Sequence, residues 1–318
     1  MAKNHFAWLD FLVYLVARLL VCTVQALSLN TARTFATGLA RLVYHCDRRH
    51  RLVAMENLRL AFPGRYNESE LDLLVRSVYR HFCTLLIEIM HLPRKMHPTT
   101  WRQYFELDRD RGRVLVDCLL SGRPVMLVTG HFGNWEMGGF ALGLFGFKGY
   151  AIARPLDNRY LDQYMRRFRE STGQKVLAKQ GDFEQIQNVL SQGGVLATLA
   201  DQDAGRRGLF VDFFGRPAST HKAVALLALE HRVPLVVFGA AKRGEPMRYQ
   251  AVIADVIVPE NYSGQPDALR CITQRFTSAL EAMIRSAPEQ YFWLHRRWKH
   301  EPAKPHRKAA GAVFWPIM

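Results

Sequence analysis

The chain has 318 residues, and 43 lysines and arginines outnumber 28 aspartates and glutamates, giving a formal net charge of +15 at pH 7. This length allows one large domain, or a domain with an appendage, and the charge indicates an anionic partner, either nucleic acid or the cytoplasmic leaflet of a membrane. The five cysteines are scattered and form no C-x-x-C pair, which excludes a disulfide framework and a zinc site and is typical of reduced thiols in a cytosol-facing protein.

Residues 6–29 form a strongly apolar segment that contains two charges, Asp10 and Arg18. Its length suits a helix that crosses a bilayer, which needs about 20 apolar residues. The two charges are costly at mid-membrane depth, so an interfacial anchor is also compatible with the segment, and a soluble core helix is a further alternative. Only Lys3 precedes the apolar run as a basic residue, which argues against a cleaved signal peptide. We predict an uncleaved membrane-anchor helix over residues 1–30.

The next part of the chain, residues 31–111, is predicted to be helical. Residues 33–62 read as a helix rich in arginine, which the Pro63-Gly64 pair ends. Residues 68–92 then show the apolar spacing of an amphipathic helix.

From about residue 112 the pattern alternates between strands and helices, and we assign residues 112–300 to an α/β domain and 301–318 to a basic C-terminal tail. Strands separated by helices form βαβ units, so we expect a central, mostly parallel sheet flanked by helices on both faces. The expected strands are 124–129, 150–153, 175–178, 195–200, 234–241 and 249–258, and the expected helices are 138–144, 158–172, 183–192, 220–231 and 266–286.

The turn after the first of these strands carries the strongest functional signal. His131 follows the buried strand, and Glu136 would lie in the first turn of the next helix, close enough to orient the imidazole. Such a pair activates a hydroxyl, because the imidazole removes its proton while the carboxylate stabilises the imidazolium. A structural role for this pair is the alternative. The sequence has no His-Glu-x-x-His, Gly-x-Ser-x-Gly or G-x-x-x-x-G-K-[ST] motif that would favour a zincin, a serine hydrolase or a nucleotide-binding loop.

Arginines gather after the second strand. Arg154 ends that strand, and the next helix carries Arg166, Arg167 and Arg169. Arginine forks bind phosphate and carboxylate groups bidentately, so the cluster is a candidate site for an anionic head group or carrier. For the three helix arginines we favour the alternative, a solvated basic helix face.

Two carboxylates, Asp201 and Asp203, follow the fourth strand. A metal, a ribose or ion pairs with nearby arginines would each account for them, and the ion pairs need no metal. The following phenylalanines, among them Phe213 and Phe214, suit either an apolar flap over a lipid chain or ordinary core packing. Residues 291–300 mix aromatic and cationic side chains, which suits a membrane interface or stacking on single-stranded nucleic acid.

Several of these motifs together resemble the bacterial lipid A biosynthesis acyltransferases, with related enzymes that acylate phosphatidylinositol mannosides. The resemblance spans roughly residues 5 to 300 and is carried by ordered motifs: Asn57-Leu-Arg-Leu-Ala-Phe-Pro63, His131-Phe-Gly-Asn-Trp-Glu136, Arg154-Pro155, Asp201-Gln-Asp203, Phe213-Phe-Gly-Arg-Pro-Ala218 and Trp293-Leu-His-Arg-Arg-Trp298.

The resemblance implies a membrane-bound, glycerolipid-acyltransferase-like fold that transfers a fatty acyl group from a thioester to a hydroxyl. His131 and Glu136 match the family's H-x(4)-[D/E] pair, with the histidine as base. We expect backbone N–H groups near Gly133 and Asn134, or an arginine, to stabilise the oxyanion. Substrate-binding roles are predicted for Asn134, Arg154, Arg166, Asp201, Asp203, Phe213 and Phe214.

This interpretation requires no cofactor and no metal. The expected partners are acyl carrier protein or acyl-CoA as donor, a glycolipid or lysolipid as acceptor, and an anionic membrane surface, but not nucleic acid. The expected location is the bacterial inner membrane, with the catalytic domain facing the cytoplasm. A lipid A precursor is the expected acceptor, and a lysophospholipid, an ornithine lipid and a glycosylated phospholipid are alternatives. The rival from another class is a non-catalytic, membrane-tethered protein that binds anionic lipid or nucleic acid and does not need His131 or Glu136.

Overall fold

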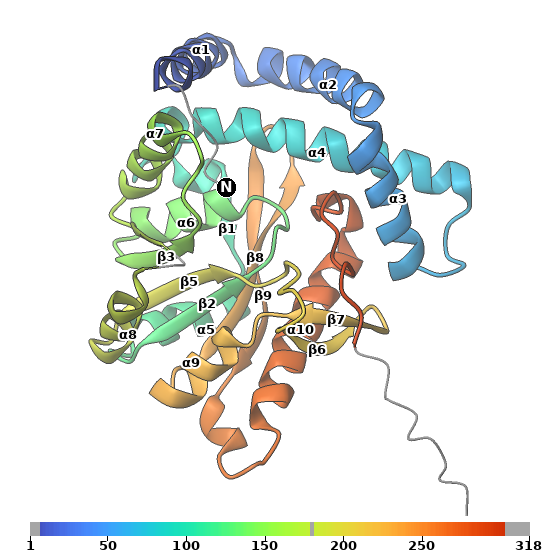
Figure 1. Cartoon of the computed structure of the whole chain (residues 1–318). Coiled ribbons are helices and arrows are strands. Elements are labelled where there is room, and N and C mark those ends of the chain that lie inside the picture. Colours follow the sequence, from blue (N-terminus) through green and yellow to red (C-terminus); the bar gives the residue numbers. More distant parts are fainter. Residues whose placement is uncertain (1–6, 179–180, 303–318) are drawn as a thin grey trace, which may run out of the picture.

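The structure of the chain, a computed structural model, describes residues 7–178 and 181–302 (Figure 1). It is an α/β structure whose mostly parallel sheet is flanked by helices, as the alternating pattern predicts. Lys3 and residues 303–318 of the predicted tail lie outside the described residues.

Among the described residues, four α-helices precede the sheet. The apolar segment forms α1 (Ala7–Ala26), and the basic segment is two helices, α2 (Leu29–Cys46) and α3 (Arg48–Ala61), rather than one. The break occurs at Asp47, whose side chain accepts a hydrogen bond from the N–H of His50 and so caps α3. The amphipathic segment forms α4 (Glu68–Lys95), which begins with a capping box between Asn67 and Glu70.

The main sheet has seven strands in the order β1-β9-β8-β2-β5-β3-β4. Every neighbouring pair is parallel except β8 with β9. Strand β1 belongs to this sheet although it lies before residue 112, and the domain division at that residue stays a prediction. The strands are β1 (Phe105–Leu107), β2 (Val125–Thr129), β3 (Gly149–Ala153), β4 (Lys175–Ala178), β5 (Val195–Leu199), β8 (Leu235–Gly244) and β9 (Arg248–Ile257).

Helices cover both faces of the sheet, and strand β2 is buried at every position. Its Met126 and Val128 pack into the larger core with residues of α8, α9 and α10, whereas Val125 and Leu127 pack on the other face with residues of α5 and α6. A continuous apolar strand is expected where both faces are covered. The covering helices are α5 (Arg109–Leu120), α6 (Trp135–Leu144), α7 (Arg159–Glu170), α8 (Phe183–Ser191), α9 (Ala223–His231) and α10 (Ala268–Ser286).

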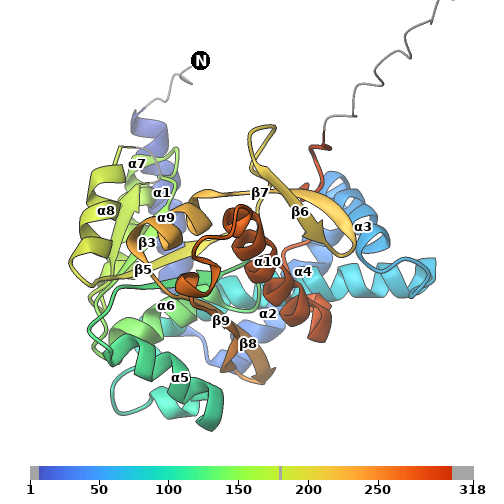
Figure 2. The ribbon, with the colours of Figure 1, turned by 90° about the horizontal axis from the view of Figure 1, so that it is seen from below.

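A separate hairpin, β6 (Leu209–Phe213) with β7 (Arg216–Thr220), packs against α10 (Figure 2). Its turn consists of Phe214 and Gly215, both with positive φ (55° and 72°), as a tight two-residue hairpin requires. The sequence pattern does not reveal this hairpin, and it places Thr220 at the end of a strand instead of in the predicted helix 220–231. The part of the chain that the structure describes also contains three short 3₁₀ helices: η1 (Trp101–Gln103), η2 (Pro259–Tyr262) and η3 (Pro288–Gln290).

Candidate active site

His131 lies just beyond the carboxyl end of β2, where open α/β sheets bind their ligands. Strand β5 is the parallel neighbour of β2, with Thr129 opposite Leu199, so Asp201 emerges at the same edge. The carboxylate of Asp201 accepts two hydrogen bonds from His131, one from the backbone N–H (2.8 Å) and one from ring Nδ1 (2.9 Å). A proton on Nδ1 leaves Nε2 as the basic nitrogen, and Nε2 has no hydrogen-bond partner among the described residues.

The two groups alter each other's pKa. Burial alone would raise the pKa of the fully buried Asp201, but the charge and hydrogen bonds of His131 hold that pKa well below its ordinary value. Burial likewise opposes the charged form of His131, yet the carboxylate of Asp201, helped by the charge of Glu136, raises the pKa of His131 above 6.5. The imidazole is therefore a stronger base than an isolated buried histidine.

A second histidine, His295, faces the same carboxylate. Its Nε2 lies 3.9 Å from Oδ2 of Asp201 and 3.2 Å from the hydroxyl of Tyr291. Burial lowers the pKa of His295 to about 4, so this ring is neutral at pH 7. The positive charge beneath the site comes instead from Arg297, which is 1% exposed and donates to the Ser219 carbonyl and the Thr220 hydroxyl.

Much of the segment 291–300 lies in the interior, since Tyr291, Trp293 and Arg297 are buried while Arg296 and Lys299 are exposed, so Tyr291 and Trp293 are not on a membrane-interface or nucleic-acid-stacking surface. Trp293 is 1% exposed, and Asn57 donates hydrogen bonds to the carbonyls of Trp293 and His295 (both 2.7 Å). His300 closes the segment by bonding Asp203 (2.7 Å). The two aspartates after β5 therefore pair with histidines, and not with the neighbouring arginines.

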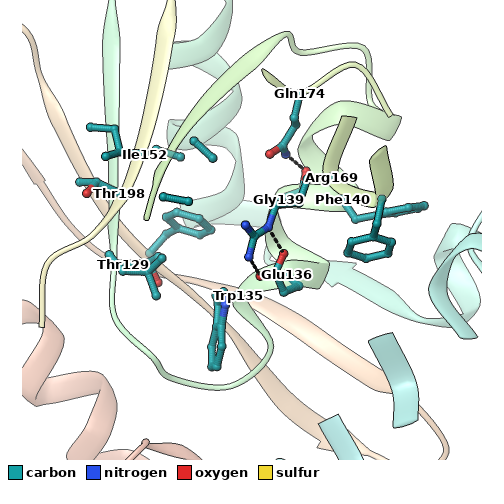
Figure 3. A pocket seen from close by; sticks show the side chains of 15 residues that line it. Thr129, Trp135, Glu136, Gly139, Phe140, Ile152, Arg169, Gln174 and Thr198 are labelled. Carbon is teal, nitrogen blue, oxygen red and sulfur yellow. Dashed lines mark hydrogen bonds and ion pairs between the residues drawn. The ribbon is translucent and has the colours of Figure 1, made fainter. Parts of the chain in front are cut away.

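Glu136 lies in the first turn of α6 as expected, but its side-chain hydrogen bonds are with Arg169 of α7 and not with His131. The pair is bidentate, with N···O distances of 3.0 and 2.5 Å, and the two side chains are only 10% and 26% exposed (Figure 3). The orienting position that the sequence suggests for Glu136 is occupied by Asp201. Arg169 consequently does not lie on a solvated helix face.

An apolar pocket of about 490 Å³ opens beside His131. Apolar side chains make up most of its wall, and Glu136 lies in that wall near His131. A smaller cavity of about 80 Å³ shares Trp135, Glu136 and Phe168 with it, and the Glu136–Arg169 pair lies in the wall of that cavity (Figure 3). The other residues that line the apolar pocket are Val21 of α1, Phe82, Leu85, Leu86, Ile89, Met90 and Pro93 of α4, Tyr164, Met165 and Phe168 of α7, and Phe292.

Asn134 is fully buried and does not line this pocket. Its side chain caps α6 by accepting from the N–H of Met137 (2.9 Å), and its own N–H donates to the carbonyl of Ala240 (2.8 Å). The N–H of Gly133 donates to the carbonyl of Gln290 (2.9 Å). Both amides proposed from the sequence as oxyanion donors are therefore already bonded. Gly133 has φ of +60°, and a Cβ there would lie 1.9 Å from the Ala240 oxygen, so this turn requires glycine.

Two other predicted ligand-binding arginines lie apart from the pocket wall. Arg154 follows β3 at the same sheet edge as His131, but its side chain is 83% exposed and its ion-pair partner is Asp157 (3.4 Å). Arg166 pairs with Asp162 (2.9 Å) and donates to the carbonyl of Val176.

Phe213 and Phe214 are core residues, 1% and 5% exposed, and do not line the apolar pocket. They pack against Trp293, Trp298 and Phe62. This aromatic packing buries them, so they form no flap over a lipid chain.

Comparison with known proteins identifies relatives over most of the chain. The profile of the family described as bacterial lipid A biosynthesis acyltransferase matches residues 3–300. The lipid A biosynthesis lauroyltransferase of Escherichia coli is 25% identical over 270 residues, which cover 83% of this chain and 84% of the relative. The palmitoleoyltransferase of the same organism is 26% identical over 80% of both chains. A phosphatidylinositol mannoside acyltransferase of Mycolicibacterium smegmatis is 26% identical over 76% of this chain and 77% of its own length.

Proposed function

The chain belongs to the bacterial lipid A biosynthesis acyltransferase family, and we propose that it moves a fatty acyl group from an acyl thioester to a hydroxyl of a lipid A precursor or a related glycolipid. The observation that carries the proposal is the His131 ring. A buried carboxylate holds one of its nitrogens, and the ring lines an apolar pocket. That combination supports a role for His131 as a base beside a compartment suited to an acyl chain.

In the proposed reaction, Nε2 of His131 removes the proton of the acceptor hydroxyl as that oxygen attacks the thioester carbonyl. The tetrahedral intermediate then collapses, the C–S bond breaks, and the imidazolium returns the proton to the departing thiolate. Asp201 keeps Nδ1 protonated and stabilises the imidazolium between these steps. The charge of Glu136 also favours the imidazolium, but from a greater distance than Asp201. Its carboxylate is held by Arg169 and does not bond to the ring.

The oxyanion donors must differ from the two amides that the turn already uses. The N–H groups of Trp135 and Glu136, in the first turn of α6, have no acceptor among the described residues, and both residues line the pocket beside His131. We assign the oxyanion to this helix end, where unpaired amides and the helix dipole favour negative charge. One such donor contributes on the order of 3 kcal/mol to a transition state of this kind.

The donor and acceptor are proposed from the same surroundings. The acyl chain occupies the apolar pocket, and acyl carrier protein or CoA supplies the thioester. Arg154 is exposed at the edge that carries His131, so it is suited to contact a phosphate of the acceptor or the carrier. The similarity to a phosphatidylinositol mannoside acyltransferase makes a glycosylated phospholipid the second candidate acceptor.

The protein is proposed to act at the bacterial inner membrane with its catalytic domain facing the cytoplasm. Helix α1 is long and apolar enough to cross a membrane, with a mean hydropathy of 1.9, and most of its surface is exposed. Its Val21 also lines the apolar pocket, so the proposed anchor and the acyl site adjoin.

A thiol-release assay tests the proposal. Purified protein in mixed micelles should release free thiol from an acyl-carrier thioester when the lipid acceptor is present, and mass spectrometry should detect the acylated acceptor. His131→Ala should abolish this transfer while the variant still unfolds cooperatively, although its melting temperature should fall because the buried Asp201 loses its ring partner. Transfer at a near-normal rate by that variant would refute His131 as the base.

A further inference from the structure

A second pocket, of about 470 Å³, lies on a different face of α4 from the apolar pocket. Ser77, Arg80, His81 and Thr84 of α4 line it, and their spacing of three to four residues places them on one face of the helix. The pocket is polar and basic, because Arg33 of α2 and Lys242 and Arg243 near the end of β8 complete much of its wall.

Two of the four cations are neutralised within the pocket. Arg33 pairs with Glu245 (2.9 Å), and Lys242 pairs with Glu245 (3.0 Å) and with the buried Glu88 (2.7 Å). Burial lowers the pKa of His81 to about 4, so the histidine adds no charge at pH 7.

The other two cations are Arg80 and Arg243. Neither has an ion-pair partner among the described residues, and the remaining carboxylate in the pocket wall is Glu289. Arg243 donates its Nε to Gln250 (2.8 Å), which leaves its terminal nitrogens available. A pair of arginine forks in a polar pocket favours a phosphate group, whose oxygens accept bidentate hydrogen bonds.

The same basic surface continues along α2. A neighbouring groove of about 260 Å³ shares Thr37, Ser77 and Arg80 with the pocket and adds Arg41. On α2, Arg33, Thr37 and Arg41 recur every four residues and face these cavities. Phe35 and Leu42, seven residues apart, lie on another side of the helix and are 50% and 61% exposed.

Helix α2, which follows α1, thus carries arginines on one side and exposed apolar side chains on another, and this amphipathic character suits a lipid surface better than a soluble anion. Figure 1 shows α1 and α2 in succession over α4. We propose that this pocket binds the phosphate of an anionic phospholipid head group through Arg80 and Arg243. The proposal does not depend on acyl transfer.

The floor of the pocket also contacts the turn that carries His131. The ring Nε2 of His81 is 3.2 Å from the carbonyl oxygen of Gly133. The N–H of Gly133 donates to the carbonyl of Gln290, which also lines the pocket. A head group in the pocket would therefore lie next to His81, the side chain that contacts the Gly133 carbonyl.

The test is to titrate lipid into the full chain in neutral detergent micelles and to measure the melting temperature at each lipid concentration. Phosphatidylglycerol should raise the melting temperature saturably, because a ligand of the folded state stabilises it, whereas phosphatidylcholine should not. Arg80→Gln with Arg243→Gln should weaken the apparent affinity by about tenfold or more, since both forks are lost.

The matched control is Arg48→Gln with Arg49→Gln, which removes the same charge from exposed positions of α3. This control should titrate like the wild-type protein. An equal loss of apparent affinity in both double variants would show that general attraction to the basic surface, and not this pocket, binds the lipid. If inorganic phosphate raised the melting temperature saturably at the same concentrations as the lipid, the proposal that a lipid head group is the ligand would be wrong. The His131→Ala protein should respond to phosphatidylglycerol normally, so failure of the acyltransferase proposal is distinguishable from failure of this one.

Discussion

His131 and Asp201 are 70 positions apart, and they meet because β2 and β5 are parallel neighbours that end at the same edge. The sequence places each residue at a strand end, but it does not state which strands are adjacent. The nearer carboxylate, Glu136, is therefore the natural choice from spacing alone. The structure pairs it with Arg169, and Arg169 belongs to a helix whose arginines look solvated in the sequence.

The Asp201 carboxylate predicts a specific pH dependence. The proposed base, His131, must be unprotonated to act, so kcat/KM should fall as the pH drops through its raised pKa. In Asp201→Asn the negative charge is lost and the pKa of His131 falls, so the acid limb of the profile should move to lower pH. Turnover on the plateau should also decrease by roughly 10²–10⁴-fold, because the imidazolium loses its stabilising partner. An unchanged acid limb in this variant would argue against the pairing.

The Glu136–Arg169 pair predicts a coupling that a solvated arginine would not show. Arg169→Met leaves the nearly buried Glu136 carboxylate without its partner and should lower the free energy of unfolding by about 1–3 kcal/mol. Adding Glu136→Gln removes the unpaired charge, so the double variant should be more stable than Arg169→Met alone. Denaturant titrations of the single and double variants measure this coupling. Strictly additive effects would show that the pair is energetically unimportant.

At the scale of elements, the long and strongly patterned segments are predictable from sequence. Strand β2 and helix α4 follow directly from an apolar run and an amphipathic period. The hairpin β6–β7 is not predictable in the same way. Its turn requires a positive φ at Phe214, and a bulky residue rarely adopts that conformation. Packing against Trp293 and Phe62 overrides that preference, and this long-range burial is invisible in the local pattern.

The proposed anchor, helix α1, predicts how the protein partitions into membranes. Trp8, Leu12 and Leu19 are 68%, 49% and 70% exposed and do not line the apolar pocket. Replacing all three with Gln should lower partitioning into neutral lipid vesicles by about three orders of magnitude or more, because each large apolar side chain contributes about 1.5–3 kcal/mol when fully buried. The control replaces Leu120, Phe183 and Leu226, which are also exposed but lie on other helices, and it should partition normally. Equal losses in both variants would show that α1 is not the anchor.

At the scale of the whole molecule, the net charge of +15 predicts a long-range attraction to anionic lipid that differs from the proposed insertion of α1. Charge attraction is screened within about 10 Å at 0.1 M salt and about 3 Å at 1 M, whereas burial of apolar surface is not weakened by salt. The wild-type protein should therefore remain on phosphatidylglycerol vesicles at about 1 M salt. The Trp8, Leu12 and Leu19 triple variant should bind these vesicles at low salt and dissociate as salt rises. Sedimentation of both proteins across a salt series measures the two contributions separately, and release of the wild-type protein by salt alone would mean that charge, not α1, holds it on the membrane.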